Sequence, residues 1–447
     1  MATPARRIAA EVLMRVAQGG AFSNLALDAA LRQAGELPPR EVALATELSY
    51  GTLRWQLQLD RALLAHSDRA VEELDEPVRV ALRLGAFELL HHDKVPARAA
   101  VNEAVELTRE LKAGRASGFV NAVLRRLSET RAPPPPPARE VDFEGHVAAV
   151  TSHPRWMVGL WTRGLGAAEA ERLCAANQEQ APACVRVARR KGSLEQVREA
   201  LAKAGIESAP GRYAPDALVL AAGAPPALDI EGHDQGLFQA QDEAAQLVSS
   251  FAAPAADARV LDACAAPGGK ACHLAELAPR GSVLAVDLHA RKARIIAEAA
   301  QRLGIGNLQA VAADALLPIP GAEPSSFDLV LLDAPCSGLG TLRRHPEMKM
   351  RRTPEDVDRL AQLQARLLES VRAYVKPGGL LVYALCTLTP EECDEQVERF
   401  LAAQPGFRID PPPRGFPPDC LDQKFMRTLP HRTGTDGFFA ARLRRVS

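Results

Sequence analysis

The sequence predicts a multidomain protein with an all-α N-terminal domain, a small α+β middle domain and a C-terminal Rossmann-like α/β domain. Three observations predict this fold. Apolar residues recur at helical spacing up to about residue 130, five consecutive prolines follow, and short apolar runs alternate with helical segments from about residue 239. The length of 447 residues agrees, at roughly 150 residues per domain, with about three domains.

The composition excludes several classes of protein. Hydrophobic residues make up 47% of the chain and charged residues 24%, values typical of globular proteins with buried cores. The 54 Lys and Arg are balanced by 55 Asp and Glu, which argues against a uniformly basic nucleic-acid coat protein. The first helix is charged and no long apolar run follows it, so we expect no signal peptide, no membrane span and a cytoplasmic location.

The helical domain is predicted over residues 1–131. The residues Ile8, Val12, Leu13 and Val16 share one face at helical spacing. The same amphipathic pattern recurs over Arg40–His66, Pro77–His92, Arg98–Lys112 and Ser117–Ser128. Residues 132–139 contain the pentaproline and are predicted to form a semi-rigid linker, with a ligand for a proline-binding module as the alternative.

The middle domain is predicted over residues 140–238 as a small α+β linking unit. Helical patterns cover Trp156–Asn177 and Leu194–Ala204, and strand-like runs cover Cys184–Ala188 and Ala217–Leu220. The segment contains no catalytic motif that we recognise. We therefore expect Trp156 and Trp161 to be core residues rather than platforms for stacked bases.

The C-terminal domain is predicted over residues 239–447 as a parallel sheet covered by helices on both faces. Its strands are expected at Arg259–Leu261, Val283–Val286, Leu308–Val311, Leu329–Leu332 and Leu380–Ala384. Ligands of such sheets bind beyond the carboxyl ends of the strands. The residues that follow each strand are therefore the candidate functional residues.

A cofactor site is predicted in the loop after the first strand, which consists of Cys264, Ala265, Ala266, Pro267, Gly268, Gly269 and Lys270. The two glycines let the backbone approach a ligand closely at the start of a helix. A Walker A loop would need Gly at position 264 and Ser or Thr after Lys270. A complete G-x-G-x-x-G is also missing, so neither an NTPase nor a dinucleotide enzyme is favoured.

Acidic residues follow the next three strands. Asp287 comes 18 residues after Gly269, a position suited to accept hydrogen bonds from ribose hydroxyls. Asp314 follows the third strand and Asp333 ends the fourth. A single Asp after a strand is usually a turn or a helix cap, but three at one sheet edge make a binding site more plausible. Acidic groups suit a nucleoside with a cationic sulfonium, which points to S-adenosylmethionine.

Two of the eight cysteines lie at the predicted ligand edge. Cys336 closely follows Asp333, and Cys386 ends the fifth strand. Methylation at carbon 5 of cytosine needs such a thiol, because a thiolate that adds to carbon 6 makes carbon 5 nucleophilic. Asp333 is placed to hydrogen-bond ring nitrogen 3 as charge builds there. None of the cysteines forms a C-x-x-C pair, so we predict no zinc site and no other metal site.

The chain resembles a known family over essentially its whole length. Ala265–Lys270, Asp333–Cys336 and Tyr383–Thr387 are similar to motifs of the RNA cytosine-5 methyltransferases, the Nop2/Sun group. The flanking motifs of that family resemble Gly236–Asp242, Pro430–Arg432 and Thr435–Phe439, and the NusB-type RNA-binding fold resembles Val101–Leu107 and Phe119–Leu124. The combination implies methyl transfer from S-adenosylmethionine to one cytosine of 16S ribosomal RNA. We expect a monomer.

The resemblance also implies a role for each matching residue. The loop Cys264–Lys270 would wrap the cofactor, Asp287 would hold its ribose and Asp314 would lie by the adenine. Asp333 would border both the cofactor and the target base. Cys386 would be the nucleophile and Cys336 would assist release of the product. Leu385 and Thr387 depart from the commoner pattern, which has Thr or Ser before the nucleophile and Ser after it.

Three alternatives stay open at this point. The substrate could be another RNA such as tRNA, or the chain could be a DNA cytosine methyltransferase that uses Cys336 as its nucleophile. The chain could also be a non-catalytic RNA-binding or antitermination factor. The second thiol counts against the DNA enzyme, and the intact cofactor loop counts against the non-catalytic factor. A basic run beside the site is predicted to bind RNA phosphates: Arg343, Arg344, Lys349, Arg351 and Arg352.

Overall fold

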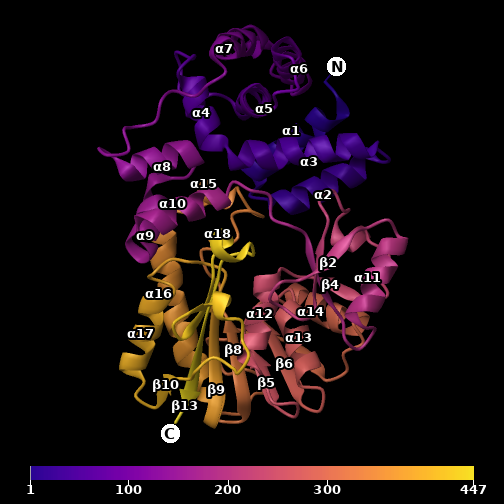
Figure 1. The fold of residues 1–447 in the computed structure, drawn as a ribbon, viewed down its shortest axis with the longest axis vertical. Helices are drawn as coiled ribbons and strands as arrows, with labels where there is room; N and C mark the ends of the chain where they lie inside the picture. Colours follow the sequence, from indigo (N-terminus) through magenta and orange to yellow (C-terminus); the bar gives the residue numbers. More distant parts are fainter. Residues whose placement is uncertain (1, 447) are drawn as a thin grey trace. The chain divides into compact units, whose positions relative to one another are not determined.

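The computed structural model describes residues 2–446, which divide into two compact units (Figure 1). The first unit extends to Gln180 and also contains Leu342–Arg351, a segment from much later in the chain. The second unit contains Ala181–Thr341 and the residues from Arg352 onward. Among residues 2–446, no helix combines the length and the apolar composition needed to cross a bilayer.

The first unit is helical. Its principal helices are α1 (Pro4–Gly19), α2 (Ser23–Ala34), α3 (Pro39–Arg54), α4 (Gln56–Leu64), α5 (Glu76–His91), α6 (Ala97–Glu110), α7 (Ser117–Thr130), α8 (Phe143–Thr151), α9 (Arg155–Leu165), α10 (Ala167–Ala176) and α15 (Met348–Arg351). Proline at the first or second position pre-organises the start of α1, α3 and α5. The apolar faces of α1, α3, α5, α6 and α7 share one buried core.

Two helices predicted as continuous are interrupted. Trp55 separates α3 from α4, so Arg40–His66 is not a single helix. Gly166 separates α9 from α10 within the predicted Trp156–Asn177 helix. Its φ of 85° is a left-handed conformation that breaks the helix and that glycine adopts without strain. Trp161 is fully buried, as predicted for a core residue.

The second unit begins with a small antiparallel sheet of strand order β2-β3-β1-β4. The strands are β1 (Cys184–Val187), β2 (Ser208–Pro210), β3 (Ala217–Leu220) and β4 (Phe238–Ala240), and the associated helix is α11 (Leu194–Lys203). The predicted runs at β1 and β3 form strands. The other two strands have three residues each, which is too short for a period-two pattern to show.

The large sheet contains the predicted parallel strands in the order β9-β8-β5-β6-β7. They are β5 (Arg259–Asp262), β6 (Ser282–Asp287), β7 (Leu308–Ala312), β8 (Phe327–Asp333) and β9 (Val375–Leu385). The chain reverses its direction of winding between β5 and β8. In a sheet of this kind that reversal opens a ligand crevice beyond the carboxyl ends of these two strands.

Helices cover both faces of the parallel strands (Figure 1). Val260 and Leu329 belong to the core beneath α12 (Glu243–Ala252), α13 (Gly269–Leu277) and α14 (Ala290–Arg302). Their neighbours Leu261 and Val330 belong to the opposite core, beneath α16 (Pro354–Val371) and α17 (Asp394–Ala403). Because alternate residues face opposite sides of a strand, burial on both faces requires the continuous apolar runs seen in the sequence.

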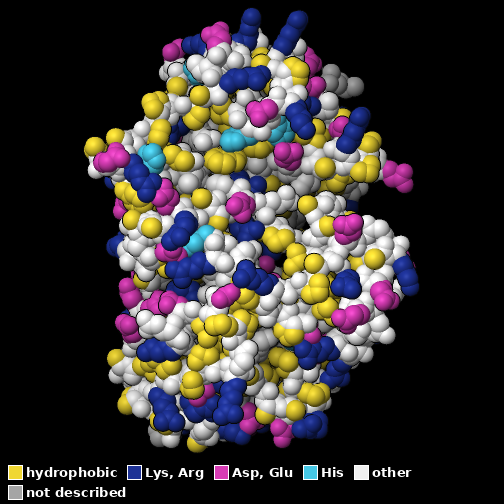
Figure 2. Space-filling view, viewed as in Figure 1, with side chains coloured by type: hydrophobic (Ala, Val, Ile, Leu, Met, Phe, Trp, Pro, Cys, Tyr) yellow, Lys and Arg dark blue, Asp and Glu magenta, His cyan; other side chains and the backbone are white. Residues whose placement is uncertain are grey.

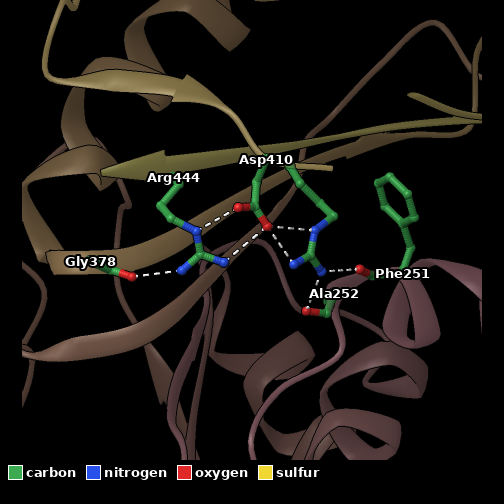
Figure 3. A network of polar contacts seen from close by, with 6 residues as sticks. Phe251, Ala252, Gly378, Asp410 and Arg444 are labelled. Atoms are coloured by element: carbon green, nitrogen blue, oxygen red, sulfur yellow. Dashed lines mark hydrogen bonds and ion pairs between the residues drawn. The ribbon is translucent and has the colours of Figure 1, made fainter. Parts of the chain in front are cut away.

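The sheet is mixed rather than wholly parallel. The antiparallel strand β13 (Phe438–Arg445) pairs with β9, and β10 (Phe407–Ile409), β11 (Leu421–Asp422) and β12 (Phe425–Thr428) extend this edge. The short helix α18 (Pro430–Thr433) precedes β13. Asp410, just after β10, accepts hydrogen bonds from Arg442 and Arg444 of β13 (Figure 3). Burial opposes ionisation of Asp410, but these two guanidinium groups lower its pKa below the ordinary value.

Candidate active site

The two predicted thiols meet at the carboxyl ends of adjacent parallel strands. Cys336 follows β8, Cys386 follows β9, and their Sγ atoms lie 3.3 Å apart. The backbone N–H of Gly340 donates to the carbonyl oxygen of Cys386 at 3.0 Å, which ties the two loops together. A Cβ at Gly340 would lie 2.0 Å from the carbonyl oxygen of Gly437, so a side chain here would force the loops apart.

Burial separates these cysteines from the structural ones. The half-buried cysteines are Cys264, Cys336 and Cys386, all at the carboxyl edge of the sheet. The other five are buried: Cys174, Cys184, Cys272, Cys393 and Cys420. Burial raises the pKa of Cys174, Cys272 and Cys420 to about 12, so these thiols stay protonated and unreactive.

The two thiols of the pair are not equivalent. The hydrogen bond with Cys386, together with burial, raises the pKa of Cys336 well above the ordinary thiol value. Cys336 therefore holds its proton and is suited to donate a hydrogen bond to the sulfur of Cys386. Since a thiolate is the nucleophilic form, this arrangement favours Cys386 as the attacking group.

Lys270 and Asp333 form an ion pair beside the thiols. Lys270 is the second residue of α13, and its Nζ lies 2.7 Å from Oδ2 of Asp333. Burial disfavours the ammonium, but Asp333 outweighs it and raises the pKa of Lys270, with a smaller electrostatic contribution from Cys386. The ammonium also lies 5.1 Å from the ring centre of Phe438. A fixed positive charge is therefore present beside Cys386.

The carboxyl end of β5 contains a buried acid without a satisfactory partner. Asp262 is fully buried, and neither of its side-chain oxygens has a hydrogen-bond partner of normal geometry among residues 2–446. Burial and the nearby charge of Asp333 raise the pKa of Asp262 to about 8, offset in part by Lys270 and the backbone N–H of Cys264. An orphaned carboxylate at a ligand crevice fits a cationic group such as the α-ammonium of S-adenosylmethionine.

The predicted cofactor loop packs closely against α14. Gly268 precedes α13 with a φ of 104°, and a Cβ there would lie 3.2 Å from the backbone of Ile296. Asp287, the last residue of β6, accepts a hydrogen bond from the backbone N–H of Ala266 at 3.3 Å. The structure therefore brings the loop Cys264–Lys270 together with Asp287 at one edge. Both fit a nucleoside cofactor, in which Asp287 would face ribose hydroxyls.

Asp314 lies one strand further along this edge. The backbone N–H of Ala313 donates to the carbonyl oxygen of Asp287 at 3.0 Å, which places the two acids in adjacent loops. The carboxylate of Asp314 accepts a hydrogen bond from the backbone N–H of Leu316 at 2.9 Å. This contact is an Asx turn, the structural role that a lone Asp after a strand usually has. The turn fixes the chain where an adenine would lie.

Arg343 and Lys349 of the predicted phosphate-binding run are buried in the first unit, and the other three cations of the run are half-buried. Burial lowers the pKa of Lys349 to about 7, and its Nζ donates to the carbonyl oxygens of Arg54 and Ser152. Arg343 is 6% exposed and donates to the carbonyl oxygen of Gln180. The prediction of RNA contact is therefore wrong for Lys349 and Arg343. On the face shown in Figure 2, Lys and Arg are interspersed with Asp and Glu.

Sequence reasoning missed two buried acids of the site. Asp262 was visible as the last residue of the first strand, and the rule that ligands bind at carboxyl ends was a sufficient signal. Glu392 lies six residues beyond Cys386 and is fully buried beneath the thiol loops. No sequence signal marked it, because its hydrogen-bond partners come from α16 and from the loops of both thiols.

Comparison with known proteins matches each part of the chain. A family model for the 16S rRNA methyltransferases RsmB/F matches residues 250–444, and a NusB family model matches residues 3–129. A model for the ferredoxin-like domain of RsmF/B-like methyltransferases matches residues 153–226. A probable ribosomal RNA small subunit methyltransferase B of Bacillus subtilis is 36% identical, covering 99% of both chains. The chain belongs to the RsmB/F methyltransferase family.

Other members of the RsmB/F family and a solved structure agree with this. Ribosomal RNA small subunit methyltransferase B of Pseudomonas syringae is 36% identical, covering 99% of this chain and 97% of its own length. PH0851, whose crystal structure is known, has 26% sequence identity to this chain, and its structure superposes with a TM-score of 0.86 over the full length of both chains. The predicted resemblance and fold are thus confirmed, and the middle domain is ferredoxin-like.

Proposed function

We propose that this protein transfers the methyl group of S-adenosylmethionine to carbon 5 of a cytosine in 16S ribosomal RNA, through a covalent adduct with Cys386. The single observation that carries the proposal is the 3.3 Å contact between Cys386 and Cys336 at the carboxyl edge of the sheet. Enzymes that methylate an exocyclic amine need no thiol, because the amine itself is nucleophilic. Two thiols in contact beside a cofactor loop fit the carbon-5 reaction.

The cofactor would be held at the ends of β5 and β6. Asp262 would accept its ammonium, Asp287 would accept hydrogen bonds from its ribose, and the glycine loop Cys264–Lys270 would pass close to it. When bound, S-adenosylmethionine supplies an electrophilic methyl group on a positively charged sulfur. A substrate base would then lie between this group and the thiols, beside Asp333 and Lys270.

Each residue near the base would have a separate task. The thiolate of Cys386 adds to carbon 6, and the electron pair moves into the ring so that carbon 5 becomes nucleophilic. The ammonium of Lys270, held in place by Asp333, donates a hydrogen bond to nitrogen 3 as negative charge builds on the ring. After methylation, Cys336 gives its proton to the departing sulfur of Cys386 and takes the proton of carbon 5. The bond between sulfur and carbon 6 breaks as the carbon 5–carbon 6 double bond forms again.

The names of the relatives support 16S ribosomal RNA as the substrate, and the NusB match supports an RNA-binding role for the helical part of the chain. A second RNA class, tRNA, is the alternative. A DNA enzyme would use Cys336 as its nucleophile, but the high pKa of that thiol favours Cys386. A purely RNA-binding factor would have no use for the ion pair and thiols described above.

One experiment tests the proposal against these alternatives. The protein is incubated with methyl-tritiated S-adenosylmethionine and, separately, with protein-free 16S ribosomal RNA, total tRNA and plasmid DNA. We expect label only in 16S ribosomal RNA, recovered as 5-methylcytidine after digestion to nucleosides and chromatography. Label in another nucleoside would overturn the carbon-5 assignment, and label mainly in tRNA or DNA would overturn the substrate.

Several sequence predictions remain predictions. They are the domain boundaries at 1–131, 132–139, 140–238 and 239–447, the monomeric state and the cytoplasmic location. The structure adds one fact that bears on any truncation. Because Leu342–Arg351 is part of the first unit, removal of residues 1–131 would take away the carbonyl oxygen of Arg54 that accepts from Lys349 and leave that of Ser152.

A further inference from the structure

A fully buried carboxylate lies beneath the loops that carry the two thiols. Glu392 precedes α17 and accepts hydrogen bonds at both side-chain oxygens. Its Oε1 accepts from the backbone N–H of Ser337 and from Nε2 of Gln364, each at 2.9 Å. Its Oε2 accepts from the hydroxyls of Ser337 and Thr389. Four donors satisfy a charge that would otherwise be costly to bury.

These contacts reach the loop of each thiol. Ser337 follows Cys336, and its hydroxyl also lies 2.7 Å from the hydroxyl of Thr387, which follows Cys386. Because the proton of Ser337 Oγ points to the carboxylate, the hydroxyl of Thr387 donates to Ser337. One carboxylate therefore fixes the direction of a hydrogen-bond chain that joins the two cysteine loops.

Gln364 of α16 and Tyr383 of β9 extend the network to the residues that precede each cysteine in the chain. Nε2 of Gln364 donates to the carbonyl oxygen of Pro335, the residue before Cys336, at 2.9 Å. The hydroxyl of Tyr383 lies 2.8 Å from the carbonyl oxygen of Glu392 and 3.0 Å from Oε1 of Gln364, and it shares its single proton between these two acceptors. Both side chains are fully buried, so water does not compete for these bonds.

We propose that Glu392 is a positioning residue that decides which of the two thiols is the nucleophile. It does so by holding the loops in contact through Ser337 and by placing a fixed negative charge near Cys336. That charge also contributes to the raised pKa of Cys336, together with Cys386 and Asp333. The inference rests on the proposed function, in which Cys386 attacks and Cys336 keeps its proton.

The variant Glu392→Gln is expected to fold. Its amide oxygen can replace Oε1, and its amide nitrogen can donate to the hydroxyls of Ser337 and Thr389, which can accept. The hydroxyl of Ser337 must then turn its proton toward Thr387, and the negative charge near Cys336 is lost. The matched control is Glu395→Gln, the same change on a half-exposed residue of α17 that pairs with Arg399.

The test measures the reactivity of each thiol without RNA or cofactor. The variants are treated with iodoacetamide from pH 6 to pH 10, and peptides with Cys336 and Cys386 are quantified by mass spectrometry. In Glu392→Gln we expect the labelling of Cys336 relative to Cys386 to rise at least about threefold at pH 8, equivalent to half a pKa unit. We also expect its pH midpoint to fall, while Glu395→Gln matches the wild type.

An unchanged ratio and midpoint in Glu392→Gln would overturn the proposal. If that variant does not fold, Ser337→Ala takes its place, because it keeps the charge and removes the link to Thr387. We then expect faster labelling of both thiols with no change in the midpoint of Cys336, and unchanged labelling would overturn the proposal. Since no RNA enters the measurement, its result is independent of whether the wild type methylates RNA.

Discussion

Two buried acids at the carboxyl edge of the large sheet differ in their hydrogen bonding. At the ends of β5 and β6, Asp262 is fully buried, its side-chain oxygens have no hydrogen-bond partner of normal geometry among residues 2–446, and burial raises its pKa to about 8. At the ends of β8 and β9, Glu392 is equally buried and accepts four hydrogen bonds. An unsatisfied buried group costs free energy that a ligand can recover, whereas a satisfied one builds a rigid scaffold.

This difference separates two tasks at one sheet edge. The thiol side is closed by internal hydrogen bonds before any substrate arrives, so changes there should alter chemistry rather than affinity. The cofactor side leaves the buried acid Asp262 unsatisfied and gives Asp287 only a long hydrogen bond of 3.3 Å from Ala266, so changes there should alter affinity rather than chemistry. The predictions below test this division, beginning with the largest expected effect.

Removal of the proposed nucleophile has the largest effect. Cys386→Ala leaves no group to add to carbon 6, so methylation and the covalent RNA complex should both disappear. The loss should span many orders of magnitude, because carbon 5 is barely reactive without the adduct. Filter binding of labelled product and a denaturing gel measure the two losses. A trapped protein–RNA band in this variant would contradict the assignment.

Removal of the second thiol should stop the reaction one step later. In Cys336→Ala, Cys386 still attacks and the methyl group is transferred, but release of the sulfur is slowed. The product should remain attached and appear as a slow-migrating protein–RNA band on a denaturing gel. Cys420→Ala, a change at a buried cysteine outside the two thiol loops, is the control and should release product normally. Multiple turnover by Cys336→Ala would remove this thiol from the mechanism.

On the cofactor side, Asp262→Asn should have opposite effects on affinity and stability. We expect about 1.5–3 kcal/mol weaker binding of S-adenosylmethionine, since a charge-assisted hydrogen bond is lost. A carboxyl whose pKa is raised by folding binds more protons folded than unfolded, so it destabilises the protein increasingly as pH rises toward about 8. The variant should therefore be more stable than the wild type at pH 8. Calorimetry and thermal melts at pH 5 and pH 8 measure both, and equal affinities would exclude Asp262 from the site.

For Asp287→Ala we expect an effect on affinity alone. Its carboxylate should bind ribose hydroxyls, so the affinity for S-adenosylmethionine should fall by roughly 1.5–3 kcal/mol, with the maximal rate little changed at saturating cofactor. Part of any loss could come from the loop, because Asp287 also accepts a hydrogen bond from Ala266. Asp287→Asn separates the loss of the ribose contact from the loss of the loop contact, because it keeps an acceptor for the backbone N–H of Ala266. It should therefore retain more affinity than Asp287→Ala. Unchanged calorimetric affinity in both variants would contradict the role.

The meeting of the candidate catalytic residues at one edge of the sheet was predictable from the sequence. The predicted strands are mainly apolar, although Gln309 interrupts the third, and parallel strands bring their carboxyl ends to one edge. Asp333, Cys336 and Cys386 could therefore be placed together without a structure. The motif loop Cys264–Lys270 was equally visible, because its glycines follow the first strand directly.

Other features were decided only by the tertiary structure. The cations Arg343 and Lys349 have the sequence pattern of an RNA-binding run, yet they are buried against carbonyl oxygens of residues more than a hundred positions away. The pairing of the antiparallel strand β13 with β9 and the hydrogen bonds of Glu392 also join residues that are far apart in the sequence. The local sequence pattern indicates which residues are buried and which lie at the end of a strand. Which distant donor satisfies a buried charge depends on packing that no local pattern contains.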